Sequence, residues 1–304
     1  MSRIDEALKR AQAGQPASGP AAGGSLPAPE IFQDSWAVSD EAKPAATSAS
    51  RRLPPAGDTS ALVTPAPPPA FASFPPAVVE KIVTTPTVRP AFVEQYRKLA
   101  GTLHHAQIER STKVVMVTSA LAGEGKTLTA TNLALTISNS YQRSVLLIDA
   151  DLRRPTLHDV FQVPNVTGLG DGLRSEAEQR LSLVQVSPKL TLLTAGRPDP
   201  DPISGLTSER MQRVIEEAAA RFDWVIVDTP PVGLLPDANL LARMVDSVLL
   251  VVRAGSTPYP LIQRAVAAVG RERILGVVLN RVEDGISSSY HYYSYYDHYG
   301  RKSE

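Results

Sequence analysis

The 304-residue sequence contains no cysteine. This absence excludes a disulfide framework, a thiolate nucleophile, a zinc site built on cysteine and an iron–sulfur cluster held by cysteine. The sequence also lacks any apolar run near the ~18 residues of a membrane span, and residues 248–252 form one of its longest. The opening residues, MSRIDEALKR, are charged where a secretory signal would be apolar. We therefore expect a cytoplasmic chain that reaches a membrane only through another protein.

Neither sign of charge is in excess, because 31 basic residues balance 31 acidic ones. A chain without net charge has no overall field that would attract nucleic acid or an anionic membrane surface. A localised patch could still bind either, but we expect no nucleic-acid partner.

Proline is distributed unevenly, with 13 of the 26 prolines between Ala13 and Val79, among many alanine, glycine and serine residues. Proline lacks an amide donor, and this stretch has no sustained apolar period, so it cannot build a core. For residues 1–12 a short amphipathic helix is predicted, and a frayed terminus is the alternative. The other predicted parts are a disordered Pro/Ala-rich linker over 13–80, a globular domain over 81–286 and a tyrosine-rich tail over 287–304.

Apolar runs alternate with helical patterns in the second half of the sequence. The runs are apolar at consecutive positions, which is typical of strands buried on both faces of a parallel sheet. They lie at residues 113–118, 144–149, 190–194, 223–228, 247–252 and 274–280. Helical patterns lie at 127–140, 208–221 and 260–270, and an earlier one begins at Pro90. This alternation predicts an α/β fold with a doubly wound, mostly parallel sheet flanked by helices.

The segment ALAGEGKT at residues 120–127 follows a predicted strand and leads into a predicted helix. It has the spacing of a P-loop with alanine in the first glycine position, and it therefore predicts a P-loop NTPase. Gly123 and Gly125 let backbone amides approach phosphates closely, at the positive end of the helix dipole. Lys126 would reach the β- and γ-phosphates, and the Thr127 hydroxyl would bind Mg²⁺. The adjoining residues expected to contact the nucleotide are Ala122, Glu124 and Leu128.

Three aspartates end apolar runs. Asp228 ends the run WVIVD, where a P-loop NTPase places a carboxylate that holds Mg²⁺ through water. Asp149 and Asp151 end another run two positions apart, so in an extended chain their side chains point the same way. Each aspartate alone could be a helix cap or a turn residue. Three of them beside one P-loop favour a metal and phosphate site.

Four segments together resemble one family, the bacterial tyrosine kinases of polysaccharide export. They are ALAGEGKT, LLIDADLRRP, VIVDTPP and the tyrosine cluster at residues 290–299, supported by the shorter phrases PDA and GVVLN. The resemblance extends over about residues 93–299, and the opening MSRIDEALKRAQ resembles the soluble, exosortase-associated subset of the family. The family implies an ATP- and Mg²⁺-dependent protein-tyrosine autokinase that regulates exopolysaccharide biosynthesis, chain length or export.

The resemblance also implies roles at the matching positions. Lys126 and Thr127 would bind ATP and Mg²⁺. Asp149 and Asp228 would organise the metal and its waters, and Asp151 would accept the tyrosine proton. A carboxylate base helps because a phenol with a pKa near ~10 is a poor nucleophile at neutral pH. Further implied contacts are Arg153, close to the phosphates, and Asn280, at the adenine.

Six of the nine tyrosines lie close together near the end of the sequence. A packed core does not explain this cluster, because it has no aliphatic neighbours and no clean period. We interpret it as the phosphoacceptor region, and an aromatic low-complexity tail used for stacking or assembly is the alternative. The predicted phosphoacceptors are Tyr290, Tyr292, Tyr293, Tyr295, Tyr296 and Tyr299.

The resemblance further implies oligomerisation and partners. The family carries a Glu-x-x-Arg-x-x-Arg helix that packs subunits into a ring, and here Glu94 and Arg97 are present but Ala100 takes the third place. We expect a homo-oligomer in which the tail of one subunit enters the active site of its neighbour, with a less stable ring. A polysaccharide co-polymerase, or chain-length regulator, would hold the chain at the inner membrane, and a tyrosine phosphatase would reverse the modification.

Two other functions remain open on the sequence alone. A partitioning or positioning ATPase of the same P-loop class would carry a signature lysine early in the loop, where this chain has Leu121, and would need no tyrosine cluster. A non-catalytic, nucleotide-gated scaffold would bind a membrane partner without chemistry, and it would not use transferable phosphate on the tail.

Overall fold

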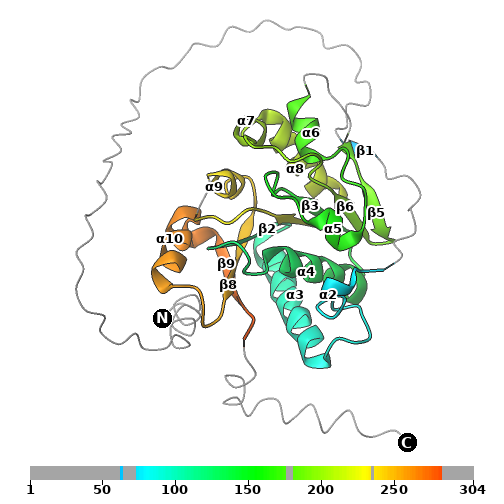
Figure 1. Cartoon of the computed structure of the whole chain (residues 1–304), viewed down its shortest axis with the longest axis vertical. Helices are drawn as coiled ribbons and strands as arrows, with labels where there is room; N and C mark the ends of the chain where they lie inside the picture. Colours follow the sequence, from blue (N-terminus) through cyan, green and yellow to red (C-terminus); the bar gives the residue numbers. More distant parts are fainter. Residues whose placement is uncertain (1–61, 64–72, 176–180, 234–235, 283–304) are drawn as a thin grey trace, which may run out of the picture. The chain divides into compact units, whose positions relative to one another are not determined.

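A seven-stranded sheet lies at the centre of the described residues, which are 62–63, 73–175, 181–233 and 236–282 of this computed structural model (Figure 1). Its strand order is β5-β6-β3-β7-β2-β8-β9, and all neighbouring strands are parallel except β5 and β6. The predicted doubly wound, mostly parallel sheet is therefore confirmed. The strand bounds are β2 Val114–Ser119, β3 Val145–Asp149, β5 Val184–Ser187, β6 Leu190–Leu193, β7 Trp224–Asp228, β8 Ser247–Arg253 and β9 Ile274–Asn280.

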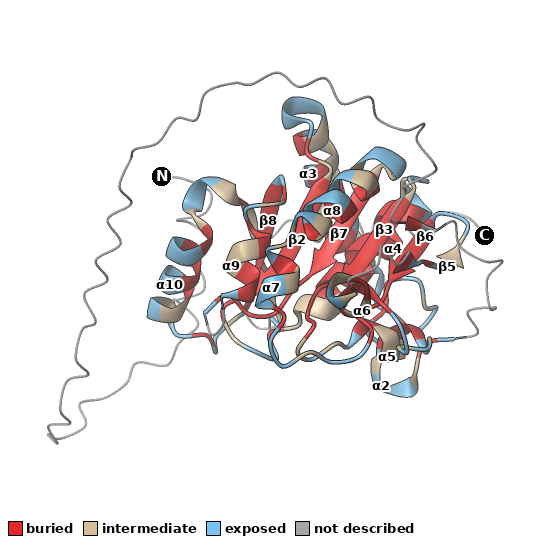
Figure 2. Ribbon diagram, turned by 90° about the horizontal axis from the view of Figure 1, so that it is seen from above, coloured by how far each residue is buried: buried red, intermediate tan, exposed pale blue. Residues whose placement is uncertain are grey.

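Helices cover both faces of the sheet because the central strands are apolar at successive positions. In β2, Val115 and Val117 pack into the core with α3 and α4, whereas Val114 and Met116 pack into the core on the other face with α8, α9 and α10. Figure 2 shows the central strands buried and the outer surfaces of the helices exposed. The helix bounds are α3 Pro90–Arg110, α4 Lys126–Ser140, α8 Glu209–Arg221, α9 Asp237–Leu241 and α10 Tyr259–Val269.

The longer elements were predictable from their patterns. All six predicted strands and the three predicted helical segments are found, and their ends agree within one residue. Pro90 begins α3, where its fixed φ and missing N–H suit the first turn. The helix then buries Tyr96, Leu103 and Ala106 at helical spacing and ends at Ser111, which has a left-handed φ of 55°.

Parts of the predicted linker, residues 13–80, carry described secondary structure and core contacts. Leu62–Val63 form β1, which pairs in parallel with β4 (Leu181–Ser182). Phe74 packs against Phe161 with ring centroids 5.8 Å apart, and Pro76–Val79 form the short helix α2. These apolar residues are separated by prolines, so no sequence period indicates their packing. The predicted helix over 1–12 and the rest of the linker lie outside the described residues.

Several short elements are also absent from the sequence-based prediction, because a segment of about one turn shows no period. They are α5 Leu157–Phe161, α6 Leu169–Arg174, α7 Ile203–Leu206 and the 3₁₀ helix Arg271–Arg273. Within the described ranges, no helix combines the length and the apolar character that crossing a bilayer requires.

Candidate active site

The loop between β2 and α4 carries the ALAGEGKT residues at the carboxyl edge of the sheet. Gly123 and Gly125 have φ angles of 80° and 97°, in the left-handed region that glycine adopts without strain. A Cβ atom on Gly125 would lie 2.1 Å from Asn280 Nδ2, so a side chain there would clash. Gly125 directly precedes α4, whose first N–H groups have no partners within the helix. The loop therefore offers an anion the positive end of a helix and closely approachable amides.

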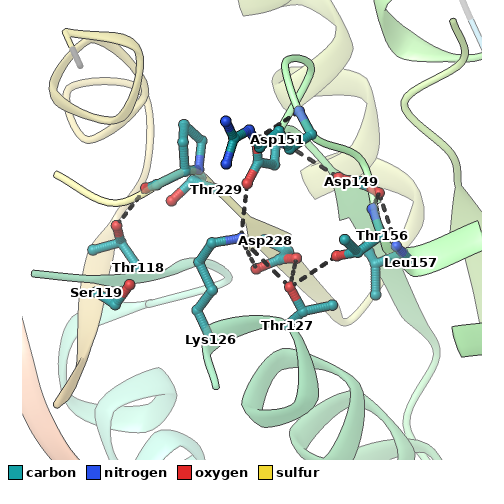
Figure 3. A network of polar contacts seen from close by, with 12 residues as sticks. Thr118, Ser119, Lys126, Thr127, Asp149, Asp151, Thr156, Leu157, Asp228 and Thr229 are labelled. Atoms are coloured by element: carbon teal, nitrogen blue, oxygen red, sulfur yellow. Dashed lines mark hydrogen bonds and ion pairs between the residues drawn. The ribbon is translucent and has the colours of Figure 1, made fainter. Parts of the chain in front are cut away.

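Lys126 and Thr127, the first two residues of α4, reach the carboxylates at the strand ends (Figure 3). Lys126 Nζ lies 2.8 Å from Asp151 Oδ2 and 3.8 Å from Asp228 Oδ1. Thr127 Oγ1 donates a hydrogen bond to Asp228 Oδ2 at 2.7 Å. Burial alone would lower the pKa of Lys126, but the negative charges of Asp228 and Asp151 outweigh it, so the pKa is raised. The structure thus brings four of the predicted site residues together.

Asp228 has one carboxylate oxygen to which no described residue donates a hydrogen bond. The side chain is fully buried, and its Oδ1 atom accepts no hydrogen bond from the described residues. Burial raises the pKa of this carboxyl even though Lys126 lies nearby. A buried carboxylate oxygen without a donor is a place that a cation can satisfy. Together with the Thr127 hydroxyl, it supplies two of the oxygen ligands that Mg²⁺ prefers.

Histidine and acidic side chains form no larger metal cluster in the described part of the chain, where no three of them are placed to hold an ion together. The donor set therefore fits a cation that takes its remaining ligands from phosphate and water, as Mg²⁺ does in nucleotide sites. It does not fit a metal enclosed by protein side chains.

Asp149 makes structural contacts with both of its oxygens. Oδ1 accepts the backbone N–H of Asp151 at 3.2 Å, and Oδ2 accepts those of Thr156 and Leu157 at 3.1 and 3.0 Å. Burial raises the pKa of Asp149 to about 8, and the Asp228 carboxylate also raises it. These contacts hold the turn after β3 that carries Asp151. The role of Asp149 in organising the metal stays a prediction.

Glu124 was predicted to contact the nucleotide, and this stays a prediction for its backbone, because its carboxylate contacts the protein. The residue is 2% exposed and accepts the backbone N–H groups of Leu121 at 2.8 Å and Arg253 at 3.2 Å. It also accepts the Thr257 hydroxyl, and its carbonyl oxygen accepts Asn280 Nδ2 at 2.8 Å. Glu124 therefore joins the P-loop to the carboxyl ends of β8 and β9. The motif spacing marks this residue as part of the loop but does not show which way its side chain points.

Arg153 does not contact the P-loop residues described above. Its Nε donates to Asp237 Oδ2 at 2.7 Å, and its Nη1 donates to the Pro200 carbonyl. Asp237 is only 1% exposed and begins α9. The guanidinium thus joins three loops at the carboxyl edge, and the expected position close to the phosphates stays a prediction. Asp237 was not among the predicted site residues, although the PDA phrase contains it.

The other predicted contacts are distributed around the loop. Ala122 and Gly123 are exposed, so their backbones are accessible to a ligand. Leu128 is partly buried and packs against the core that α3 and α4 share. Asn280 lies beside the loop through its bond to Glu124. The six predicted phosphoacceptor tyrosines lie outside the described residues.

Comparison with known proteins agrees with this geometry. Residues 115–300 match the family model described as the CobQ/CobB/MinD/ParA nucleotide binding domain. The match spans more than half of the chain, so the chain belongs to this class of nucleotide-binding domains. Within the class it belongs to the bacterial tyrosine kinases. It is 36% identical over 212 residues to tyrosine-protein kinase YwqD of Bacillus subtilis, which covers 69% of this chain and 89% of YwqD.

Two findings on an Escherichia coli kinase support the same assignment. Tyrosine-protein kinase etk is 36% identical over 204 residues, which cover 66% of this chain and 28% of that longer protein. The solved structure of its kinase domain matches this chain with a TM-score of 0.58 at 33% identity, over 63% of this chain and 77% of the solved chain. The family resemblance drawn from the sequence is therefore confirmed, and it favours the kinase over the positioning ATPase.

Proposed function

We propose that this chain is an ATP- and Mg²⁺-dependent tyrosine autokinase that phosphorylates its C-terminal tyrosine cluster in a neighbouring copy. The convergence of Lys126, Thr127, Asp151 and Asp228 at one end of the P-loop helix is the observation that carries the proposal. It places a cation, a hydroxyl and two carboxylates where a nucleotide triphosphate and a phenol can meet. The membership in the tyrosine-kinase family supports the choice of tyrosine as the acceptor.

The reaction needs positioning and charge neutralisation more than covalent help from the protein. The tyrosine oxygen attacks the γ-phosphorus of ATP, the new O–P bond forms, and the bond from the γ-phosphorus to the β–γ bridging oxygen breaks to release ADP. Lys126 and the loop amides bind the phosphates. The phenol proton passes to the carboxylate of Asp151, which is 5% exposed and lies 2.8 Å from Lys126 Nζ.

Thr127 and Asp228 are the residues that would hold Mg²⁺, because they provide the hydroxyl and the unsatisfied carboxylate oxygen. Mg²⁺, when bound, supplies positive charge that neutralises the phosphates and helps to orient them. Asp149 contributes by holding the turn on which Asp151 stands.

Assembly and output follow from the family and belong to the same proposal. Glu94 and Arg97 form an ion pair of 3.6 Å on the exposed side of α3, whereas Ala100 is only 2% exposed. The third position of the family's packing motif thus faces the core here, which supports a homo-oligomer with a less stable ring. We propose a chain-length-regulating membrane protein as activator, a tyrosine phosphatase as antagonist, and control of exopolysaccharide synthesis, chain length or export as the output.

The test is the intact mass of the purified full chain after incubation with Mg²⁺ and ATP. We expect several phosphate additions in the wild type and none in Lys126→Met, whereas Lys189→Met, a change of an exposed lysine, keeps them. Deletion of residues 290–304 is expected to remove most additions. Phosphates that survive this deletion would move the acceptor sites elsewhere in the chain.

If the purified chain alone incorporates no phosphate, the incubation is repeated with the cytoplasmic fragment of the membrane partner. No phosphate with that fragment present, despite measurable ATP binding, would favour the scaffold or the positioning ATPase. The proposed output is tested separately by gene deletion, and unchanged amount and length of the polymer would contradict it.

A further inference from the structure

The backbone of Leu62 is held by two side chains of helix α8 and by pairing with strand β4. Glu217 Oε2 accepts the backbone N–H of Leu62 at 3.3 Å, and Arg221 Nη1 donates to its carbonyl oxygen at 2.8 Å. Glu217 and Arg221 are four residues apart on α8, so they lie on the same face and reach the same residue. We call the surface formed by Glu217, Arg221 and β4 the α8–β4 site.

The main-chain contacts continue as a short ladder. Leu62 pairs with Leu181 and Val63 with Ser182, in parallel register. An acceptor, a donor and a strand edge thus recognise one extended residue by its backbone. Proteins that bind extended peptides by adding a strand to a sheet edge use the same kind of recognition.

The side chain of Leu62 provides the apolar anchor. It is 3% exposed and packs in the core that also contains Leu181, Leu183 and the inner residues of α8. A polar or charged residue could not occupy this position without losing water and gaining no partner. The α8–β4 site therefore selects an aliphatic residue in an extended segment.

Leu62 and Phe74 anchor the chain on opposite faces of the sheet. Leu62 belongs to the core with α8, whereas Phe74 belongs to the core with α3 and α4 on the opposite face. On the face that α3 and α4 cover, Val83 is also held, because Asn132 Oδ1 on α4 accepts its backbone N–H at 2.9 Å. The chain changes faces between these two anchors. If Leu62 were released, Phe74 would be the first anchor.

We propose that the α8–β4 site is a peptide-docking site whose occupant is this chain's own segment around Leu62, which can leave the site so that a competing peptide takes its place. Two paired residues and one buried side chain are few contacts, and such segments open locally at low free energy. The docking is therefore reversible and open to competition. Leu62 lies well before residue 115, where the family match begins, whereas the site that holds it lies within the match.

The direct test measures competition for the site in the full chain. A fluorescent peptide of residues 57–68 is titrated with the wild type and with Leu62→Asp, whose own segment cannot dock. We expect the peptide to bind the variant at least tenfold more tightly than the wild type. Leu53→Asp, the same change nine residues earlier, should behave as the wild type. Equal binding to wild type and Leu62→Asp, or no binding to either, would overturn the proposal.

Two further measurements guard against misfolding of the variant. In the wild type, hydrogen exchange at Leu62 should be slow, and Glu217→Ala should accelerate it at least tenfold because the acceptor is lost. Glu216→Ala, at the exposed neighbouring position on α8, is the matched control and should leave the exchange unchanged. Fast exchange at Leu62 in the wild type, or no effect of Glu217→Ala, would contradict the docking. None of these readouts requires ATP, so the outcome is independent of the proposed kinase activity.

Discussion

Asp149 and Asp228 end neighbouring strands in the same register, and both side chains are fully buried, yet their surroundings differ. Asp149 accepts three backbone N–H groups and has no oxygen left without a donor. Asp228 accepts the Thr127 hydroxyl on one oxygen and no hydrogen bond from the described residues on the other. The same residue at equivalent positions thus stabilises a turn on one strand and leaves a ligand position open on the next.

Glu124 extends the comparison to the P-loop itself. Like Asp149, it is buried and satisfied by protein donors, here from Leu121, Arg253 and Thr257. Two of the three buried carboxylates compared here therefore hold loops in place, and only Asp228 is available to a cation. Substitutions at these positions should separate the two roles.

The largest effect is expected from Asp228→Asn. The amide keeps an oxygen for the Thr127 hydroxyl but loses the negative charge beside the proposed Mg²⁺ position. We expect the rate of autophosphorylation to fall by about 10²–10³-fold, while the melting temperature changes little. Phosphate incorporation and thermal unfolding are measured on the same sample. A large loss of stability with a small loss of rate would assign Asp228 the structural role instead.

Asp149→Ala should lower the stability of the fold more clearly than Asp228→Asn does. It leaves the N–H groups of Asp151, Thr156 and Leu157 without their acceptor in a buried region. We expect the free energy of unfolding to fall by about 1–3 kcal/mol, as measured by urea denaturation without nucleotide. Asp228→Ala under the same conditions is the control and should lose less, because the Thr127 hydroxyl and the more distant Lys126 ammonium lose a partner, but no set of three backbone N–H groups does. Equal losses in the two variants would remove the distinction.

Glu124→Gln tests whether loop position affects nucleotide binding. A glutamine has one acceptor oxygen, and its NH₂ group would face backbone N–H groups that the carboxylate now accepts. We expect the KM for ATP to rise about tenfold with a smaller change in kcat, because the displaced loop binds phosphate less well. Thr257→Val removes a single donor and should have a weaker effect. A fall in kcat at unchanged KM would mean that Glu124 acts on the chemical step rather than on loop position.

The sequence predicted the sheet and the contents of the P-loop well, for a physical reason. Strands such as β7 are buried on both faces and so are apolar at nearly every position, and the loop needs glycine, lysine and threonine at fixed spacing. The direction of side chains such as Glu124 and Arg153 depends on partners more than 80 residues away, at Arg253 and Asp237. No local pattern encodes such contacts.

The two-residue strand at Leu62 was missed for a related reason. Its neighbours are small residues and prolines, which are typical of a linker, and only the edge of β4 and two side chains of α8 make it a strand. Tertiary contacts override local propensity where an element is this short. The composition of residues 13–80 therefore concealed an anchored segment within the predicted linker.

The smallest expected effect is the pH dependence that Asp149 gives to the folded state. Burial raises the pKa of Asp149 to about 8 from the ordinary value of 3.8. A group whose pKa is raised on folding stabilises the protein fully below the unfolded pKa, and this contribution is lost as the pH rises through the folded pKa. Between pH 7 and 8, without nucleotide or Mg²⁺, Asp149 should thus lower the free energy of unfolding by less than ~1.4 kcal/mol, because this residue releases at most one proton.

The asparagine in Asp149→Asn cannot titrate, so the free energy of unfolding should fall less steeply between pH 7 and 8. The fall that remains is due to Asp228, because burial also raises the pKa of that carboxyl. Asp223→Asn is the matched control. Burial opposes ionisation of Asp223, but its hydrogen bonds with Ser144 outweigh burial and lower the pKa, so its contribution is lost only as the pH falls below the ordinary range. Its removal should leave the slope at pH 7–8 unchanged. A slope that survives in Asp149→Asn at full size would mean that the three backbone N–H groups keep Asp149 ionised, and that the two neighbouring carboxylates differ in their contacts but not in their charge.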